Sequence, residues 1–232
     1  MERKPRVAAK IVVTTDGPYL VTGGVPVSKQ IIVSNAQGES LQWKEGEKYP
    51  EREQCALCRC GESKNKPFCS GRHKEVGFDG RETADRRAYM EQAGKIVGLT
   101  MVLTDAESLC AFARFCDPKG GVWNATERAA DAESRQIVEH EAGCCPGGRL
   151  VAWDKASKKA LEPEFEKSIG LIEDPAEGVS GPIWVRGGIP VVAADGIEYE
   201  VRNRVALCRC GQSSNKPYCD GTHAWMKFRD DR

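Results

Sequence analysis

The sequence predicts a β-rich α+β protein in which two similar cysteine-containing β units flank a small α+β insert. Two observations support this fold class. One pattern occurs near both ends of the chain, and the segment between the copies has its own short strand and helix patterns. Since a repeated pattern marks a repeated structural unit, we divide the chain into an N-terminal unit (1–79), an insert with its linker (80–179) and a C-terminal unit (180–232).

Each copy consists of two blocks. Residues 17–27 (GPYLVTGGVPV) match residues 181–191 (GPIWVRGGIPV), with both prolines, all three glycines and two valines in register. Residues 57–73 (LCRCGESKNKPFCSGRH) match residues 207–223 (LCRCGQSSNKPYCDGTH), and a phenylalanine follows five residues after each histidine. The chain therefore contains two versions of one cysteine-rich motif.

Each motif carries three cysteines and one histidine that are suited to metal binding. Residues two apart project to the same side of an extended segment, and residues four apart share one face of a helical turn. Two such pairs suit a two-iron cluster with one pair on each iron. The predicted ligands are Cys58, Cys60, Cys69 and His73 in the first copy, and Cys208, Cys210, Cys219 and His223 in the second.

Zinc is the alternative metal, because three cysteines and one histidine form an ordinary structural zinc set. The Cys-x-Cys pair is tighter than the usual gap in such sites, which counts mildly against zinc. The odd total of 11 cysteines argues against a disulfide framework. Cys55 is interpreted as spare, since Val205 occupies its place in the second copy. Spacing alone leaves both metals open.

The pattern Cys-x-Cys-x2-Ser-x3-Pro-x-Cys-x-Gly-x-His resembles the signature of the CDGSH iron–sulfur proteins, the mitoNEET class. Residues 219–223 are nearly the pentapeptide of that name, whereas the first copy has Ser70 and Arg72 at the second and fourth positions. The resemblance implies a [2Fe–2S] cluster in each copy, with one iron held by two cysteines and the other by cysteine and histidine. Units of this family pair as homodimers, so it also implies an intramolecular pseudo-two-fold pair within a monomer.

Residues around the ligands are expected to tune the clusters. Ser63 and Ser213 are predicted to contact the cofactor by donating hydrogen bonds toward cluster sulfurs. Arg59 and Arg209 either offset the negative charge of the cluster or are simply solvated. A histidine ligand raises the reduction potential above that of an all-cysteine site and makes cluster retention depend on pH.

The insert is predicted to have strands at 99–103 and 149–153, helices from Thr104 through Cys116 and from 131 to 143, and a linker at 162–178. It holds four further cysteines. We interpret them as structural or spare thiols, because the gap from Cys110 to Cys116 matches no compact cluster loop. A third cluster is the less favoured alternative. These cysteines are Cys110, Cys116, Cys144 and Cys145.

The overall composition and the absence of certain motifs exclude several classes of function. Lys+Arg and Asp+Glu balance at 34 each, so no basic field favours nucleic acid. The basic first ten residues are followed by no apolar signal or membrane segment, so we expect a cytoplasmic protein that binds no membrane. No phosphate loop, nucleophile elbow or dinucleotide fingerprint indicates an enzyme.

We therefore predict a soluble, non-enzymatic carrier of two [2Fe–2S] clusters. It would serve electron transfer with a redox partner, cluster transfer to an apo-protein acceptor, or both. The alternatives are a zinc-binding structural or interaction module without redox function, and an enzyme subunit whose insert supplies an active site.

Overall fold

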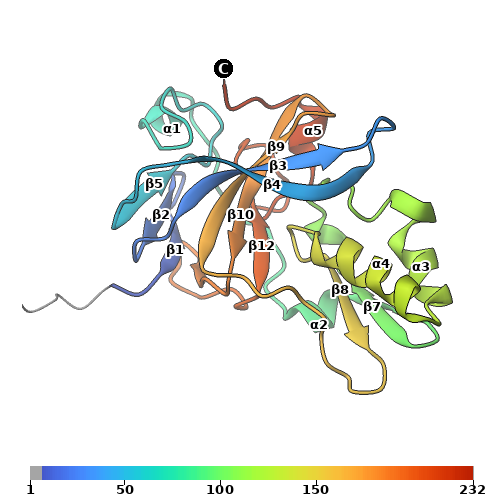
Figure 1. The fold of residues 1–232 in the computed structure, drawn as a ribbon. Helices are drawn as coiled ribbons and strands as arrows, with labels where there is room; N and C mark the ends of the chain where they lie inside the picture. Colours follow the sequence, from blue (N-terminus) through green and yellow to red (C-terminus); the bar gives the residue numbers. More distant parts are fainter. Residues whose placement is uncertain (1–6, 232) are drawn as a thin grey trace, which may run out of the picture.

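The computed structural model describes residues 7–231, which form three β-sheets and short helices (Figure 1). Most of the basic N-terminal stretch lies outside the described residues. The predicted β-rich α+β class is confirmed. Among the described residues no helix has the length and apolar character needed to cross a membrane.

The sheets contain four, five and three strands. The first has the order β11-β1-β2-β5, with bounds Val191–Val192, Lys10–Val13, Tyr19–Thr22 and Gln54–Leu57. The second has the order β12-β10-β9-β3-β4, with bounds Arg204–Leu207, Val179–Arg186, Ser168–Asp174, Val27–Ser34 and Ser40–Lys48. The third has the order β6-β7-β8, with bounds Gly94–Val97, Met101–Asp105 and Leu150–Asp154.

The helices are short, and the longest lie in the insert. The α-helices are α1 (Arg72–Glu75), α2 (Tyr89–Gln92), α3 (Val122–Arg128), α4 (Ala132–Gly143) and α5 (Thr222–Trp225). Two 3-10 turns, η1 (Glu107–Leu109) and η2 (Pro118–Gly120), lie between β7 and α3.

Strands from opposite ends of the chain share the two larger sheets. Strand β1 pairs in parallel with β11, and β3 pairs in parallel with β9; Figure 1 shows blue and orange strands side by side in one sheet. The prediction that 162–178 is a linker is wrong, because β9 lies there between β10 and β3. Its apolar residues Ile169, Leu171 and Ile172 are buried, and this burial stabilises the strand.

One apolar core joins the two copies. It includes Ile11, Val13 and Leu57 from the first copy and Ile183, Val185 and Leu207 from the second. Because alternate residues of a strand face the same side, each strand can contribute to this core while presenting other residues elsewhere. The two cysteine loops at the ends of β5 and β12 are therefore held by a common framework.

The insert has its own smaller core beneath α3 and α4. The predicted helix at 131–143 is confirmed as α4, whose Asp131 carboxylate caps the helix by accepting the Ser134 N–H at 2.8 Å. The predicted strands are confirmed as β7 and β8, shifted by one or two residues. The predicted helix from Thr104 through Cys116 is wrong. Thr104, the N-cap of the predicted capping box, instead lies in strand β7, where its hydroxyl accepts a hydrogen bond from Trp153 Nε1 at 2.9 Å.

The two cysteine loops touch each other through a pair of glycines. A Cβ placed on Gly61 would stand 2.5 Å from the carbonyl oxygen of Cys210, and a Cβ on Gly211 would meet the carbonyl oxygen of Cys60 as closely. Both glycines have φ near +81°, a conformation that disfavours side chains. The Tyr19 hydroxyl adds a hydrogen bond across the same junction, at 2.9 Å from the Cys208 carbonyl oxygen.

This contact predicts an unequal effect of two similar substitutions. Gly61→Ala should lower the free energy of unfolding by about 3 kcal/mol, from backbone strain plus the clash with the opposite loop. Gly196→Ala is the control, because Gly196 has φ +86° but open space around it, and should cost only about 1 kcal/mol. Urea unfolding followed by tryptophan fluorescence measures both. Equal losses would contradict a close contact between the loops.

Candidate metal centres

Each cysteine loop begins where a strand ends. Strand β5 ends at Leu57 and leads directly into Cys58, whose N–H donates to the Pro67 carbonyl oxygen at 2.8 Å. The Cys69 N–H in turn donates to the Ala56 carbonyl oxygen at 2.8 Å. These two bonds fold the loop back, so that its third cysteine lies beside the first two. Strand β12 and the loop after Leu207 repeat the arrangement.

The structure brings the predicted ligands together in pairs. The Sγ atoms of Cys58 and Cys60 are 3.7 Å apart, and the Cys69 Sγ lies 3.4 Å from His73 Nδ1. The second copy repeats these distances at 3.8 Å (Cys208–Cys210) and 3.4 Å (Cys219–His223). Two thiolates bound about 2.3 Å from one tetrahedral metal stand about 3.8 Å apart. Each pair therefore has the spacing needed to hold one metal.

The pairs remain distinct from one another. Within residues 7–231, no three His, Cys, Asp or Glu side chains lie close enough together to hold a single metal ion. The four ligands of each motif thus form two separate pairs, and the donor set of three thiols and one imidazole suits iron as well as zinc.

Backbone N–H groups point at the sulfur atoms. Glu62 donates to Cys60 Sγ at 3.5 Å, Gly71 to Cys69 Sγ at 3.3 Å, and Gly221 to Cys219 Sγ at 3.4 Å. Such donors stabilise negative charge on sulfur. At Cys219 the Gly221 N–H opposes burial, which is the larger effect and raises the pKa of that thiol.

The paired thiols differ in acidity. The Cys60 thiol, helped by backbone N–H groups of Ser63 and Gly61, lowers the pKa of Cys58 to about 6 against the opposing effect of burial. The pKa of Cys60 is correspondingly raised by its bond to Cys58 and by burial. In the second copy the pKa of Cys208 is lowered to about 7, chiefly by Cys210. Near neutral pH, one thiolate is thus favoured in each Cys-x-Cys pair.

The two motif serines contact the loop differently from the prediction. The Ser63 hydroxyl donates to the Phe68 carbonyl oxygen at 2.6 Å, and the Ser213 hydroxyl to the Tyr218 carbonyl oxygen at 2.7 Å. A hydroxyl has one proton, so neither side chain also donates to sulfur. The serines brace the loop with their hydroxyls and act on the first cysteine through their backbone N–H groups.

The arginine between the first two cysteines anchors each loop. Arg59 is only 1% exposed, so it is not solvated; its Nε donates to the Gly17 carbonyl oxygen at 2.8 Å, and its guanidinium lies 5.1 Å from the Phe78 ring centre. The second copy repeats this set with Arg209, Gly181 and Phe228. Sequence reasoning missed this anchoring role, although the recurrence of all three residues was a signal for it.

The two arginines have different electrostatic surroundings. Arg209 forms ion pairs with Asp230 at 2.7 Å and Glu173 at 3.2 Å. Arg59 forms no ion pair with any described residue, and its buried Nη1 has no hydrogen-bond partner. Gly80 occupies the place in the first copy that Asp230 has in the second. The first centre therefore lies beside an unneutralised buried cation.

The second centre is covered and the first is open. His223 is 4% exposed, whereas His73 is only partly buried and borders a shallow depression with Lys74. The insert provides the cover: the Asn215 side chain donates to the Ser108 carbonyl oxygen at 2.7 Å, and the rings of Phe112 and Trp225 lie 5.9 Å apart. Burial, aided by Arg209, lowers the pKa of His223 to about 4.

Cys116 lies within electrostatic reach of two other cysteines of the insert. The pKa of Cys116 is raised by burial and by Asp117, and also by the nearby thiols of Cys145 and Cys110. Burial, with a contribution from Cys145, raises the pKa of Cys144 to about 11, and the Cys144 Sγ lies 3.9 Å from the His140 ring nitrogens. Cys110 also acts electrostatically on Cys219 of the second centre. One insert thiol thus lies within electrostatic reach of that centre.

Comparison with known families agrees with this geometry. The family model described as "Iron-binding zinc finger CDGSH type" matches residues 16–74 and 180–224. The chain thus contains two CDGSH-type iron–sulfur domains in tandem. Searches of curated proteins and of solved structures gave no match.

A second family model, described as "Divergent 4Fe-4S mono-cluster", matches residues 96–155 of this tandem CDGSH protein. The matched segment contains all four insert cysteines, for which the sequence interpretation favoured structural or spare thiols. The available signal was Cys145-Pro146, since a cysteine followed by proline is typical of the last ligand in ferredoxin-type runs.

The unequal surroundings of Arg59 and Arg209 predict an effect on one centre only. Asp230→Asn should raise the reduction potential of the second centre by on the order of tens of millivolts, because removing a nearby negative charge favours the more negative reduced state. Asp195→Asn removes an exposed acid that is paired with Arg86; it is the control and should shift neither centre. Redox titration followed by electron paramagnetic resonance measures both; no shift with Asp230→Asn would refute the electrostatic argument.

Proposed function

We propose that this protein is an electron carrier with a [2Fe–2S] cluster in each end unit. The observation that carries the proposal is the separation of each ligand set into two pairs, Cys58–Cys60 and Cys69–His73, with distances repeated in the second copy. One pair holds each iron, and His73 and His223 bind through Nδ1. When bound, such clusters supply one-electron redox chemistry.

The same pairing disfavours mononuclear zinc. A tetrahedral zinc ion needs all four ligands around one point, with every thiolate pair about 3.8 Å apart. Here that spacing occurs within the Cys58–Cys60 pair, while the set of four is spread over two pairs. Backbone N–H donors to Cys60 and Cys69 offset the negative charge of a bound cluster.

We further propose that the two CDGSH units form a pseudo-two-fold pair within a monomer. The reciprocal packing of Gly61 against Cys210 and of Gly211 against Cys60 supports this, because mutual contacts of equivalent residues are the mark of a two-fold interface. The shared core and shared sheets also support it.

The insert adds a third iron–sulfur site in this proposal. Cys110, Cys116 and Cys145 lie within electrostatic reach of one another, and the segment matches a cluster-binding family model. Since Cys110 also lies near Cys219, the insert site adjoins the covered second centre. Redox centres this close to one another suit a protein that moves electrons internally.

Cluster transfer is a second candidate function, and it concerns the first centre. Cys69 and His73 are partly exposed, whereas Cys219 and His223 are buried. An apo-protein acceptor, like a redox partner, would approach at the open edge beside His73. The second centre would retain its cluster under the cover of the insert.

Metal and sulfide analysis of anaerobically purified protein tests the proposed function. Two [2Fe–2S] sites give about four iron and four sulfide per chain, and an occupied insert site raises both values. The protein should be coloured and should bleach on reduction with dithionite. A colourless protein with about two zinc and no sulfide would refute the proposal.

A pair of adjacent cysteines provides a matched control for the insert site. Cys145→Ser should remove the iron bound in the insert and leave the two CDGSH sites unchanged, because Cys145 acts electrostatically on Cys116. Cys144→Ser should change nothing, since its thiol lies beside His140. Equal iron content in the two variants would remove the third site from the proposal and leave the other two intact.

A further inference from the structure

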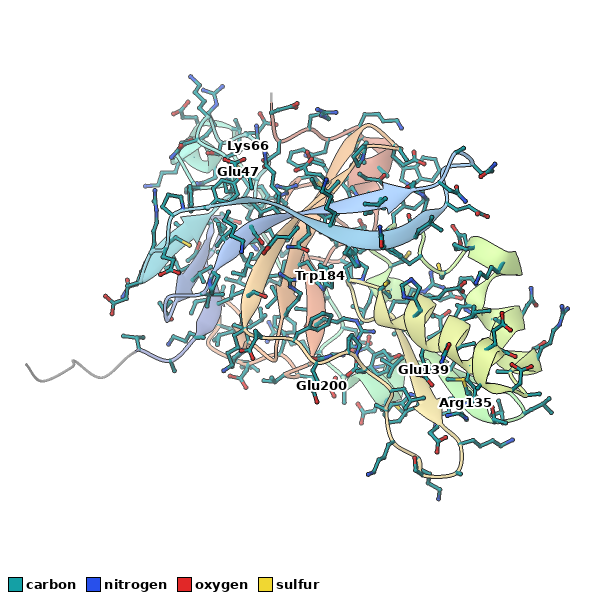
Figure 2. The ribbon with its side chains drawn as sticks, viewed as in Figure 1. Glu47, Lys66, Arg135, Glu139, Trp184 and Glu200 are labelled. Atoms are coloured by element: carbon teal, nitrogen blue, oxygen red, sulfur yellow. The ribbon has the colours of Figure 1, made fainter. Side chains whose placement is uncertain are left out.

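A cavity of about 600 Å³ opens between the insert and the central sheet. Helix α4 forms one wall and strands β4 and β10 form the other; Figure 2 labels Glu139 on α4 and Trp184 on the sheet side. The side chains important here are Trp43, Gln136, Glu139, Phe165, Trp184 and Arg186. None of the cysteines and histidines proposed above to hold clusters lines this cavity; Cys144, which does line it, is not among them.

The sheet wall of the cavity is aromatic. The ring centres of Trp43 and Trp184 are 4.7 Å apart, and Phe165 packs edge-on against Trp184 at 5.5 Å. Aromatic faces bind flat rings by stacking. The volume lies within the range of small-molecule sites, so a compound of two or three fused rings fits it.

Two hydrogen-bond donors on this wall have no acceptor. Trp184 is 1% exposed and its Nε1 has no partner, and the buried Nε of Arg186 has none either. Leaving a buried donor unpaired costs about 1–3 kcal/mol. The two residues are two apart on β10, so their side chains face the same side of the sheet. Two acceptor atoms of one ligand can therefore satisfy both donors.

The internal repeat shows that the CDGSH fold does not require these side chains. Leu20 and Thr22 occupy the corresponding positions in the first copy. Arg186 forms no ion pair with any described residue; its guanidinium instead lies 4.8 Å from the Trp184 ring centre. An unpaired arginine stacked on a buried tryptophan thus distinguishes the second copy from the first.

The charges around the cavity restrict the ligand. Glu139 lies on the opposite wall, and Glu162, which is paired with Arg204, lies at the edge. These carboxylates disfavour a phosphate or another strongly anionic group. Neutral carbonyl oxygens satisfy the donors without that repulsion, and Glu139 can accept a hydrogen bond from a ring N–H.

We propose that this cavity binds a flat fused-ring compound bearing carbonyl oxygens, the chemical class of flavins and quinones. The ring stacks against the partly exposed rings of Trp43 and Phe165, and its carbonyl oxygens accept hydrogen bonds from Trp184 Nε1 and Arg186 Nε. The inference stands independently of the proposed electron transfer, although the Trp43 Nε1 donates to the Cys144 carbonyl oxygen at 3.1 Å and so links the cavity to the cysteine segment of the insert.

Equilibrium dialysis of the full-length, cluster-loaded protein tests this, with free ligand measured in the protein-free chamber. The probes are riboflavin for flavins and 2,3-dimethyl-1,4-naphthoquinone for quinones. Trp184→Phe keeps the ring and removes the N–H, and Arg186→Met removes the other donor; each should weaken binding about tenfold. Trp153→Phe is the matched control, because it removes an indole N–H that donates to Thr104 outside the cavity, and should bind like the unaltered protein.

A third substitution, Gln136→Trp, changes the α4 wall of the cavity and leaves the aromatic side chains of the sheet wall unaltered. Gln136 is exposed on α4 and lines the cavity, so a larger side chain there should block binding without disturbing folding, which the visible spectrum checks. Binding of only one of the two probes identifies the ligand class. Retention of neither probe at about 1 mM would overturn the proposal, as would binding unchanged by Trp184→Phe, Arg186→Met and Gln136→Trp.

Discussion

The buried guanidinium between the first two cysteines is the interaction on which each centre depends. Arg59 and Arg209 fasten the cysteine loop to the opening block of the same copy through the carbonyl oxygens of Gly17 and Gly181. Because a guanidinium is planar and always charged, it can bond several carbonyl oxygens in one fixed arrangement. This constraint explains why two sequence blocks, separated by different lengths of chain, recur together with a distant phenylalanine.

The two copies share this anchor but differ in what surrounds it. In the second copy, carboxylates neutralise Arg209 and the insert covers the predicted ligands. In the first copy, Arg59 has no ion pair among the described residues, and the His73 edge is open. A duplicated unit has thus acquired two environments, one protected and one accessible, without a change in ligand type.

Much of the two end sites could be predicted from the sequence, because a motif compared with its own repeat separates shared residues from incidental ones. The four pairs of predicted ligands lie close together, as their spacing predicts. The insert has no second copy, so its cysteines could not be sorted in the same way. Strand β9 was missed because prolines and charges around it indicate a loop, whereas its partners β3 and β10 come from distant sequence.

The parallel pairing of β3 with β9 and of β1 with β11 has a consequence for the order of assembly. During synthesis the first half of the chain emerges with open sheet edges, and the strands that cover them come from the second half. Contacts between residues so far apart in sequence form slowly, and uncovered edges invite pairing with other chains. The first cysteine loop therefore leaves the ribosome long before its surroundings exist, and its final environment forms only when the last strands arrive.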